Sequence, residues 1–572
     1  MLERIRQYFI LGDSQLKLYL LAALTGLLAG SVIVAFRLFI DHSQTVVLSS
    51  NTPDDFMGLS WQWIVTLPII GGLIIGLLFT GITAEQKSVG VVHVIERLSY
   101  HEGRLPWQNF LRQFLGAAIA LISGHSVGRE GPTVHLGAAS GSFFGSILDL
   151  PNNGTRILVA SGSAAAIAAS FNTPIAGVIF AMEVIMMEYH IASFIPIILA
   201  SVSGALISRL AFGNEPFLGV ISTQMNSLWE MPYIIFLGII IGLITVGFIH
   251  SLRFFTALWV DIPLWVKTSF AGLLVGLGGL IMPEVMGMSY SIIHITHLTE
   301  LAIWSLLLLL ILKLFLSTAC IGLGIPGGLI GPTLVIGAVA GAILGHLGNS
   351  LAPELASSIG FYAIIGMTAM MGATLKAPLA ALMALLELTA NPSIILPGML
   401  AIVFANIIVF ERFKLDSIFL SLLRARGLDY RNDPVSQALR RISVANAMQR
   451  DFSVLPETIS HDDAKAALLN NPLWIIIEQE RLPISLMPAA DLARALEENS
   501  PEAMLDLFSI PASRQNLIKA SLHDSLQKAL EILESHHAEA LYISRVTAPG
   551  VERTYGVLTR QAIESHYQPP RH

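Results

Sequence analysis

Six stretches of this chain contain no Lys, Arg, Asp or Glu, and each is long enough for a helix to cross a lipid bilayer. With 54% hydrophobic and 13% charged residues, the chain has too few charged groups to cover a soluble protein of 572 residues. We therefore predict an all-α polytopic membrane domain. Its predicted spans are residues 18–36, 56–84, 157–182, 189–208, 231–252 and 388–410.

Two further apolar stretches, residues 113–148 and 314–353, are interrupted by glycine and proline, and the first contains Arg129 and Glu130. Non-helical backbone at membrane depth persists only where protein or a water-filled cavity surrounds it. These stretches are therefore predicted to be broken helices that line a permeation path.

A glycine pattern occurs twice in the membrane part. Pro132-Thr133 is followed by glycines at 137, 141 and 145, and Pro332-Thr333 is followed by glycines at 337, 341 and 345. Glycine at every fourth position lets helices approach closely, so helix packing is the role we expect for these residues.

A second repeated element ends in a glutamate. Residues 172–176 (NTPIA) precede Glu183, and residues 376–380 (KAPLA) precede Glu387, each nine positions after its proline. The symmetric recurrence predicts a scaffold role, such as helix capping. We place the two halves at about 15–215 and 230–412, as in transporters whose binding site lies where two repeats meet.

Basic residues indicate the orientation. Arginines precede the first span and basic residues follow the last, which predicts that both termini are cytoplasmic and that the number of crossings is even. The net charge of −7, with no long run of lysine or arginine, gives no sign of a nucleic-acid partner.

Two motifs resemble the CLC family of chloride channels and transporters. Residues 128–132 read GREGP, like that family's signature, and residues 328–332 read GLIGP, like its second anion loop. The resemblance covers about residues 15–425 and implies an inverted-repeat CLC fold for a membrane domain at 1–425. It also implies an integral protein of the plasma membrane (in bacteria, the inner membrane), and a homodimer with one pathway per subunit that moves chloride or other monovalent anions.

The resemblance also implies the site residues. Glu130 would be the gate, a carboxylate that occupies the outer anion site when ionised. Backbone N–H groups at helix N-termini favour an anion without trapping it as a full positive charge would. The implied anion-binding positions are Val89, Gly90, Gly128, Arg129, Gly131, Leu329, Ile330, Gly331 and Phe419.

This chain departs from the family pattern at three positions. Val89 and Phe419 stand where a serine and a tyrosine would offer hydroxyl groups, so the central site is predicted to depend on backbone amides near Leu329 and Ile330. Val184 stands where exchangers of the family usually have a second glutamate that takes protons from the cytoplasm. The pattern favours a channel-like or loosely proton-coupled conductor, and a coupled chloride/proton antiporter is the alternative.

A remote alternative comes from another class of protein. Residues 124–128 (GHSVG) match the GxSxG pattern of serine hydrolases, with Ser126 as the nucleophile. That motif requires a strand before it, a helix after it, and acid and histidine partners, whereas this match lies in an apolar helical stretch. We therefore predict no enzyme activity. The histidines also lack metal-ligand spacing, so no metal is predicted.

After about residue 425 charged residues become frequent, and the sequence repeats itself at residues 442–500 and 508–567. The two repeats resemble a tandem pair of CBS modules, an α/β fold. In that family a motif near the end of each module holds adenosine. The first repeat keeps its aspartate, Asp491, but has Pro488 at the threonine position, and the second keeps residues 556–559 (GVLT), including Thr559, but has Ala562 at the aspartate position. Because both motifs are incomplete, we expect a module that mainly stabilises a dimer, with adenine nucleotide as the only cofactor candidate.

Overall fold

The structure is a computed structural model that describes residues 15–48, 53–214, 224–259, 261–289, 301–428, 434–479, 482–498, 504–548 and 551–566. The chain forms two compact units. Of the described residues, one unit contains those within 15–147 and 155–428, and the other contains those within 148–154 and 434–566.

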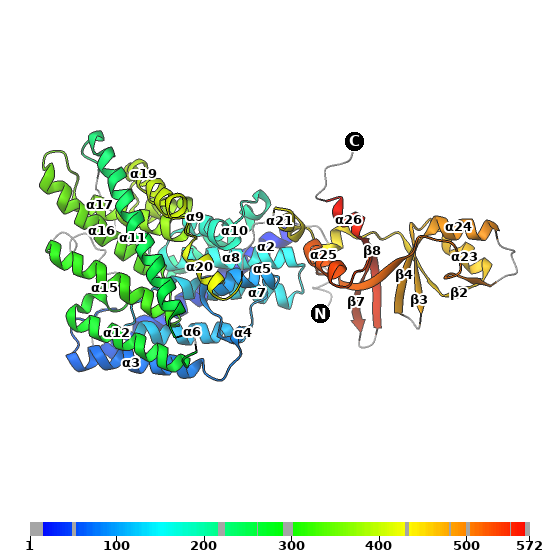
Figure 1. The fold of residues 1–572 in the computed structure, drawn as a ribbon, viewed down its shortest axis with the longest axis horizontal. Coiled ribbons are helices and arrows are strands. Elements are labelled where there is room, and N and C mark those ends of the chain that lie inside the picture. Colours follow the sequence, from blue (N-terminus) through cyan, green and yellow to red (C-terminus); the bar gives the residue numbers. More distant parts are fainter. Residues whose placement is uncertain are drawn as a thin grey trace. The chain divides into compact units, whose positions relative to one another are not determined.

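Helices make up the first unit (Figure 1). The first half has α2 (Gln15–Leu48), α3 (Trp61–Leu78), α4 (Ala84–Lys87), α5 (Gly90–Tyr100), α6 (Trp107–Ile122), α7 (Glu130–Ile147), α8 (Asn152–Phe171), α9 (Pro174–Phe180), η1 (Ala181–Met186) and α10 (Ile191–Phe212). The second half has η2 (Leu228–Glu230), α11 (Met231–Ala257), α12 (Leu264–Ile281), η3 (Pro283–Val285), α15 (Ile303–Gly322), α16 (Ile330–Leu351), α17 (Ile359–Leu375), α18 (Pro378–Thr389), η4 (Pro392–Ile394), α19 (Ile395–Asn406) and η5 (Ile407–Arg412), and α20 (Ile418–Ala425) follows it. Within the described residues, nine helices are long and apolar enough to cross a membrane.

The predicted breaks are present. In the first interrupted stretch, α6 ends at Ile122 and α7 begins at Glu130; in the second, α15 ends at Gly322 and α16 begins at Ile330. The short non-helical segments in these breaks lead into α7 and α16, which are two of the most buried helices of the unit. The prediction of broken helices is confirmed.

One predicted span was wrong. Residues 157–182 are not a single helix, because α8 ends at Phe171, Asn172 takes a left-handed conformation with φ 58°, and Pro174 starts α9. A charge-free window cannot detect such a break, since a residue with positive φ ends a helix without adding charge.

Two other spans were missed, α12 and α15, because each contains a lysine. Lys313 in α15 is fully buried, and its ammonium group donates to the carbonyl oxygens of Val285 (3.1 Å) and Gly287 (2.9 Å) and to Ser289 Oγ (2.7 Å). A charged group can stay inside the protein when hydrogen bonds replace its water. The other missed span, helix α12, lies side by side with helix α3 (Figure 1).

The repeated glycines pack helices against each other in the same way in both halves. A Cβ built on Gly137 would lie 2.3 Å from the carbonyl oxygen of Gly162, and a Cβ on Gly337 would lie 2.5 Å from that of Gly366. Contacts this short leave no space for a side chain, so α7 meets α8, and α16 meets α17, backbone to backbone. The packing role predicted for these glycines is confirmed.

The second unit contains a mixed six-stranded sheet with helices beside it (Figure 1). Its strand order is β1-β3-β4-β6-β7-β8, and in each triplet a parallel pair is followed by an antiparallel strand. The elements are α21 (Pro434–Arg441), α22 (Val444–Ala447), β1 (Phe452–Pro456), β2 (Thr458–Ile459), α23 (His461–Leu468), β3 (Trp474–Gln479), β4 (Leu482–Pro488), α24 (Ala489–Glu498), β5 (Leu505–Asp506), β6 (Gln515–Ser521), α25 (Leu526–Ser535), β7 (Ala540–Ala548), β8 (Val551–Thr559) and α26 (Arg560–Glu564). The predicted fold class is confirmed as a helical polytopic domain with broken helices, followed by an α/β region.

Candidate functional site

The first turns of α7 and α16 meet at a pair of glycines. Gly128 N–H donates to the carbonyl oxygen of Gly328 at 2.8 Å, and Gly328 N–H donates back to Gly128 at 2.7 Å. Because the bridge lies two residues before each helix, it holds together the N-termini of α7 and α16, one helix from each half. The first N–H groups of a helix have no partner within the helix and carry partial positive charge, so this meeting point favours an anion.

A carboxylate already occupies that point. Glu130, the first residue of α7, is fully buried, and its Oε2 accepts a hydrogen bond of 3.0 Å from Gly331 N–H in the first turn of α16. A Cβ built on Gly128 would lie 2.0 Å from this oxygen, and one built on Gly328 would lie 3.0 Å from it. Glycine at both bridge positions therefore leaves space for the carboxylate.

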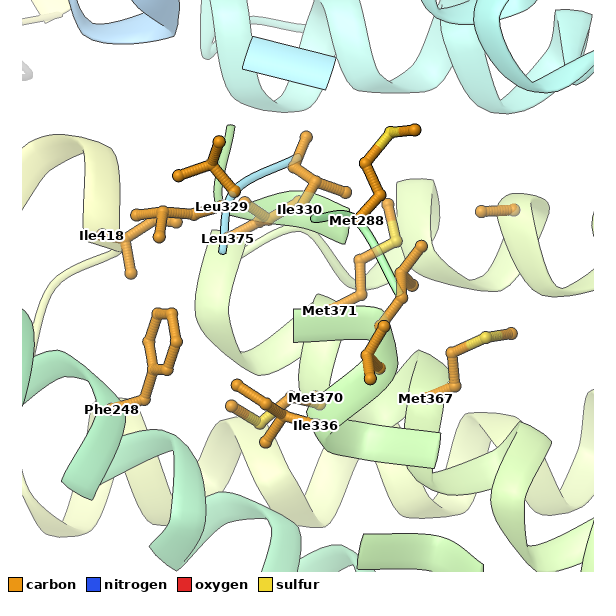
Figure 2. Packing of buried hydrophobic residues seen from close by; sticks show 14 of the residues in the cluster. Phe248, Met288, Leu329, Ile330, Ile336, Met367, Met370, Met371, Leu375 and Ile418 are labelled. Atoms are coloured by element: carbon orange, nitrogen blue, oxygen red, sulfur yellow. The ribbon is translucent and has the colours of Figure 1, made fainter. Parts of the chain in front are cut away.

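The neighbours of Glu130 face other partners. Arg129 is also buried, and its Nη2 donates to the carbonyl oxygen of Ser170 at 3.4 Å. A Cβ on Gly131 would lie 2.9 Å from Gly328 Cα, so this glycine allows α7 to approach the second half. In the second half, Leu329 and Ile330 belong to the large apolar cluster of this unit, together with Leu375 and Ile418 (Figure 2).

A cavity of about 300 Å³ brings predicted site residues together from both halves and from α20. Val89, the residue immediately before α5, lies in its wall with Leu329 and with Phe419 of α20. Gly90, Gly131 and Gly328 line it as well. The residues at 128, 129, 330 and 331 do not line this cavity, although they belong to the adjoining helix N-termini.

Sequence reasoning missed Gln113, which lines the same cavity from α6. Its Oε1 accepts a short hydrogen bond of 2.6 Å from Gly90 N–H, so this amide of the first half already has a partner. The two residues are 23 positions apart on different helices, and no spacing pattern links them. Lys87 and Arg426 also line the cavity, and Arg426 pairs with Glu96 at 3.4 Å.

Glu183 and Glu387 cap each other's repeat. The carboxylate of Glu387 accepts from the N–H groups of Ile175 (2.9 Å) and Ala176 (2.8 Å) at the start of α9. Glu183 accepts from Leu379 (3.3 Å) and Ala380 (2.8 Å) at the start of α18. The capping role predicted from their symmetric recurrence is confirmed.

The position after Glu183 offers no ionisable group. Val184 lies in η1 and is buried among apolar neighbours, with 3% of its surface exposed. Val184 itself therefore cannot pass a proton toward Glu130.

The hydrolase alternative finds no support around Ser126. Its Oγ shares a 3.0 Å hydrogen bond with Ser317 Oγ, while His125 Nδ1 bonds to Ser123 Oγ at 2.9 Å. The segment between α6 and α7 follows a helix, whereas a nucleophile elbow follows a strand.

The similarity of this sequence to known proteins identifies the family of the chain. Residues 71–409 match the sequence model of the family described as "Voltage gated chloride channel". The chain belongs to the CLC family. CLC proteins are transport proteins, so the chain is an integral membrane protein for anion transport and not an enzyme.

The relatives of this chain include one named as a putative channel and others named as exchange transporters. The chain is 31% identical to a "Putative chloride channel protein ClcB-like" of Ralstonia nicotianae, over 60% of this chain and 81% of that protein. It is 29% identical to the "H(+)/Cl(-) exchange transporter ClcA" of Salmonella paratyphi B, over 69% of this chain and 86% of that protein. The crystal structure of a eukaryotic CLC transporter shares the fold with a TM-score of 0.62 at 18% identity, over 96% of this chain and 98% of that one.

The two candidate nucleotide residues of the second unit have structural partners. Thr559 Oγ1 accepts from Ala562 N–H at 3.2 Å and so caps α26. Asp491, in α24, accepts from Ser513 N–H at 3.3 Å. Nucleotide binding at these residues stays a prediction of the sequence.

We expect ATP to leave the melting temperature of the full-length protein unchanged up to millimolar concentration. A ligand that binds only the folded state at 100 times its Kd would stabilise it by about 2.7 kcal/mol, which a thermal scan detects. Differential scanning fluorimetry with and without ATP measures this shift. A saturable upward shift that Asp491→Ala removes would contradict the expectation.

Proposed function

We propose that this CLC protein exchanges chloride for protons, with Glu130 as both the gate and the proton carrier. One observation carries the proposal. The Glu130 carboxylate, on the first half, accepts from Gly331 N–H at the first turn of α16, on the second half. A chloride ion would seek the same donors.

The coupling follows from competition. An ionised carboxylate and an anion cannot share one set of N–H donors, and charge-assisted hydrogen bonds hold the carboxylate there more strongly than they hold a neutral acid. Protonation of Glu130 removes the charge and weakens its hold, so proton uptake and anion entry are linked. Backbone donors bind weakly enough to release the ion on either side.

The relatives that are named as exchange transporters favour coupled exchange over the channel-like mode that the sequence favours. The Salmonella relative is named as an H(+)/Cl(-) exchange transporter. Residues 71–409, which match the family model, include Glu130 and its neighbouring glycines. A second candidate, uncoupled anion conduction, is favoured by Val184, because this buried position has no carboxylate for protons from the cytoplasm.

The proposal includes the setting in which exchange occurs. We propose a homodimer with one pathway per subunit, in the plasma membrane or its bacterial counterpart, the inner membrane. Both termini would be cytoplasmic, as indicated by the basic residues that precede the first span and follow the last one in the sequence. The second unit, with its CBS-like repeats, would contribute to the dimer.

Reconstituted protein under a chloride gradient is expected to move protons against their own gradient. Chloride flux with a chloride electrode and proton flux with a pH electrode are recorded together in the same liposome suspension. If transport is coupled, the proton flux begins with the chloride flux and stops when the chloride gradient is used up. Chloride flux without proton movement would reject exchange and establish the uncoupled alternative.

A further inference from the structure

Gln113 has one polar atom that its surroundings leave without a partner. The side chain is fully buried, and its Oε1 accepts from Gly90 N–H at 2.6 Å. An N–H group can donate only to the oxygen of a carboxamide, so this bond fixes which terminal atom is nitrogen. The remaining atom, Nε2, has no hydrogen-bond partner among the described residues.

A buried donor without a partner is rare, because it has lost its water and gained nothing in return. Gln113 lines the cavity of about 300 Å³ between the two halves, so a guest in that cavity could supply the missing acceptor. The two side chains expected to offer hydroxyl groups there, Val89 and Phe419, offer none. The residue with the unpaired donor therefore lines the same cavity as the two positions that lack a hydroxyl group.

The charge around the cavity favours an anion as that guest. Lys87 is in its wall with Arg426, which pairs with Glu96, and the N-terminal residues of α5 and the segment leading into α16 are there too. The carboxamide adds a neutral donor, which holds an anion without the strong attraction of an ammonium group at contact distance.

We propose that the Gln113 carboxamide NH2 is a ligand of the transported anion and replaces the hydroxyl donors that Val89 and Phe419 lack. The proposal rests on anion transport through this cavity and requires no proton coupling. A point donor stabilises a small, strongly hydrated anion most, whereas the apolar walls suit weakly hydrated ones. Gln113 is therefore the residue that sets the preference for chloride over larger monovalent anions.

Binding of chloride to the purified full-length protein tests the proposal without measuring transport. Gln113→Glu keeps the size of the side chain and an oxygen for Gly90 N–H, but it replaces the donor with an acceptor that repels an anion. Isothermal titration with chloride is expected to show affinity at least about tenfold weaker than in the unchanged protein. Gln113→Met, which removes the donor without adding charge, should weaken chloride binding more than thiocyanate binding.

Gln44 provides the matched control, since it is also a fully buried glutamine but its Nε2 donates to the carbonyl oxygen of Leu121 at 3.0 Å. Gln44→Met should leave chloride affinity within about twofold, because Gln44 does not line the cavity. Chloride binding of Gln113→Glu at the strength of the unchanged protein would overturn the proposal. Equal losses in Gln113→Met and Gln44→Met would overturn it as well, because they would show a general effect of cutting a buried glutamine. A failure of proton coupling in liposomes would leave both binding results unaffected.

Discussion

Glu130→Gln is expected to transport chloride with little dependence on pH and to move no protons. The carboxamide resembles the protonated acid in size but cannot ionise between pH 4 and 8. It loses the charge that holds the side chain at Gly331 N–H, so the anion meets a weaker competitor at every pH. The measurement is chloride flux from liposomes at several pH values, with proton flux recorded at the same time.

Glu230→Gln is the control for neutralising any buried carboxylate. Glu230 accepts from Tyr362 Oη and from the N–H and Oγ of Ser357, in a hydrogen-bond network that does not include Glu130. This variant should be less stable yet keep the pH profile and proton flux of the unchanged protein. If Glu130→Gln kept them too, Glu130 would not be the gate.

Gly162→Ala is expected to destabilise the membrane unit by about 3 kcal/mol or more, the upper range for overpacking a core. The added methyl group would lie 2.0 Å from the carbonyl oxygen of Gly137, and a backbone atom cannot turn aside as a side chain can. Gly366→Ala should act similarly in the second half, where the same contact is 2.4 Å. Thermal unfolding of the protein in detergent, followed by tryptophan fluorescence and gel filtration, measures the loss.

Gly247→Ala makes the same chemical change in α11 at a position where an added Cβ meets nothing within 4 Å. Helix propensity alone would make it neutral or more stable by up to about 1 kcal/mol. Similar melting temperatures for Gly162→Ala and Gly247→Ala would show that the backbone contact between α7 and α8 is less tight than these distances.

Features repeated in the sequence were predicted well. The glycines at 137 and 337 indicate two helix contacts, and Glu183 and Glu387 indicate two caps, because each pair marks one position of a duplicated fold. The broken helices were predicted for a related reason, since glycine and proline interrupt both stretches near the site. Repetition and helix-breaking residues are local signals, which a sequence displays directly.

Features that depend on distant partners were not predicted. Lys313 prevented the recognition of α15 as a span, because the carbonyl groups that accept its hydrogen bonds lie more than 20 residues earlier in the chain. Gln113 escaped notice because its significance comes from Gly90, Val89 and Phe419, which tertiary packing alone brings to one cavity. A single glutamine in an apolar helix carries no signal of that arrangement.

The reciprocal caps impose an order in time on the assembly of the chain. Glu387 follows Ile175 by 212 positions, so at ~5–20 residues per second the ribosome makes this cap roughly 10 to 40 s after the start of α9. Glu183, in contrast, is made 196 positions before Leu379, the first of its two donors, so α18 meets its cap as it emerges. An uncapped helix end in lipid costs several kcal/mol per N–H group. A nascent chain that stops before residue 387 therefore leaves the first N–H groups of α9 without their cap. Both caps are complete only when the second half has been made.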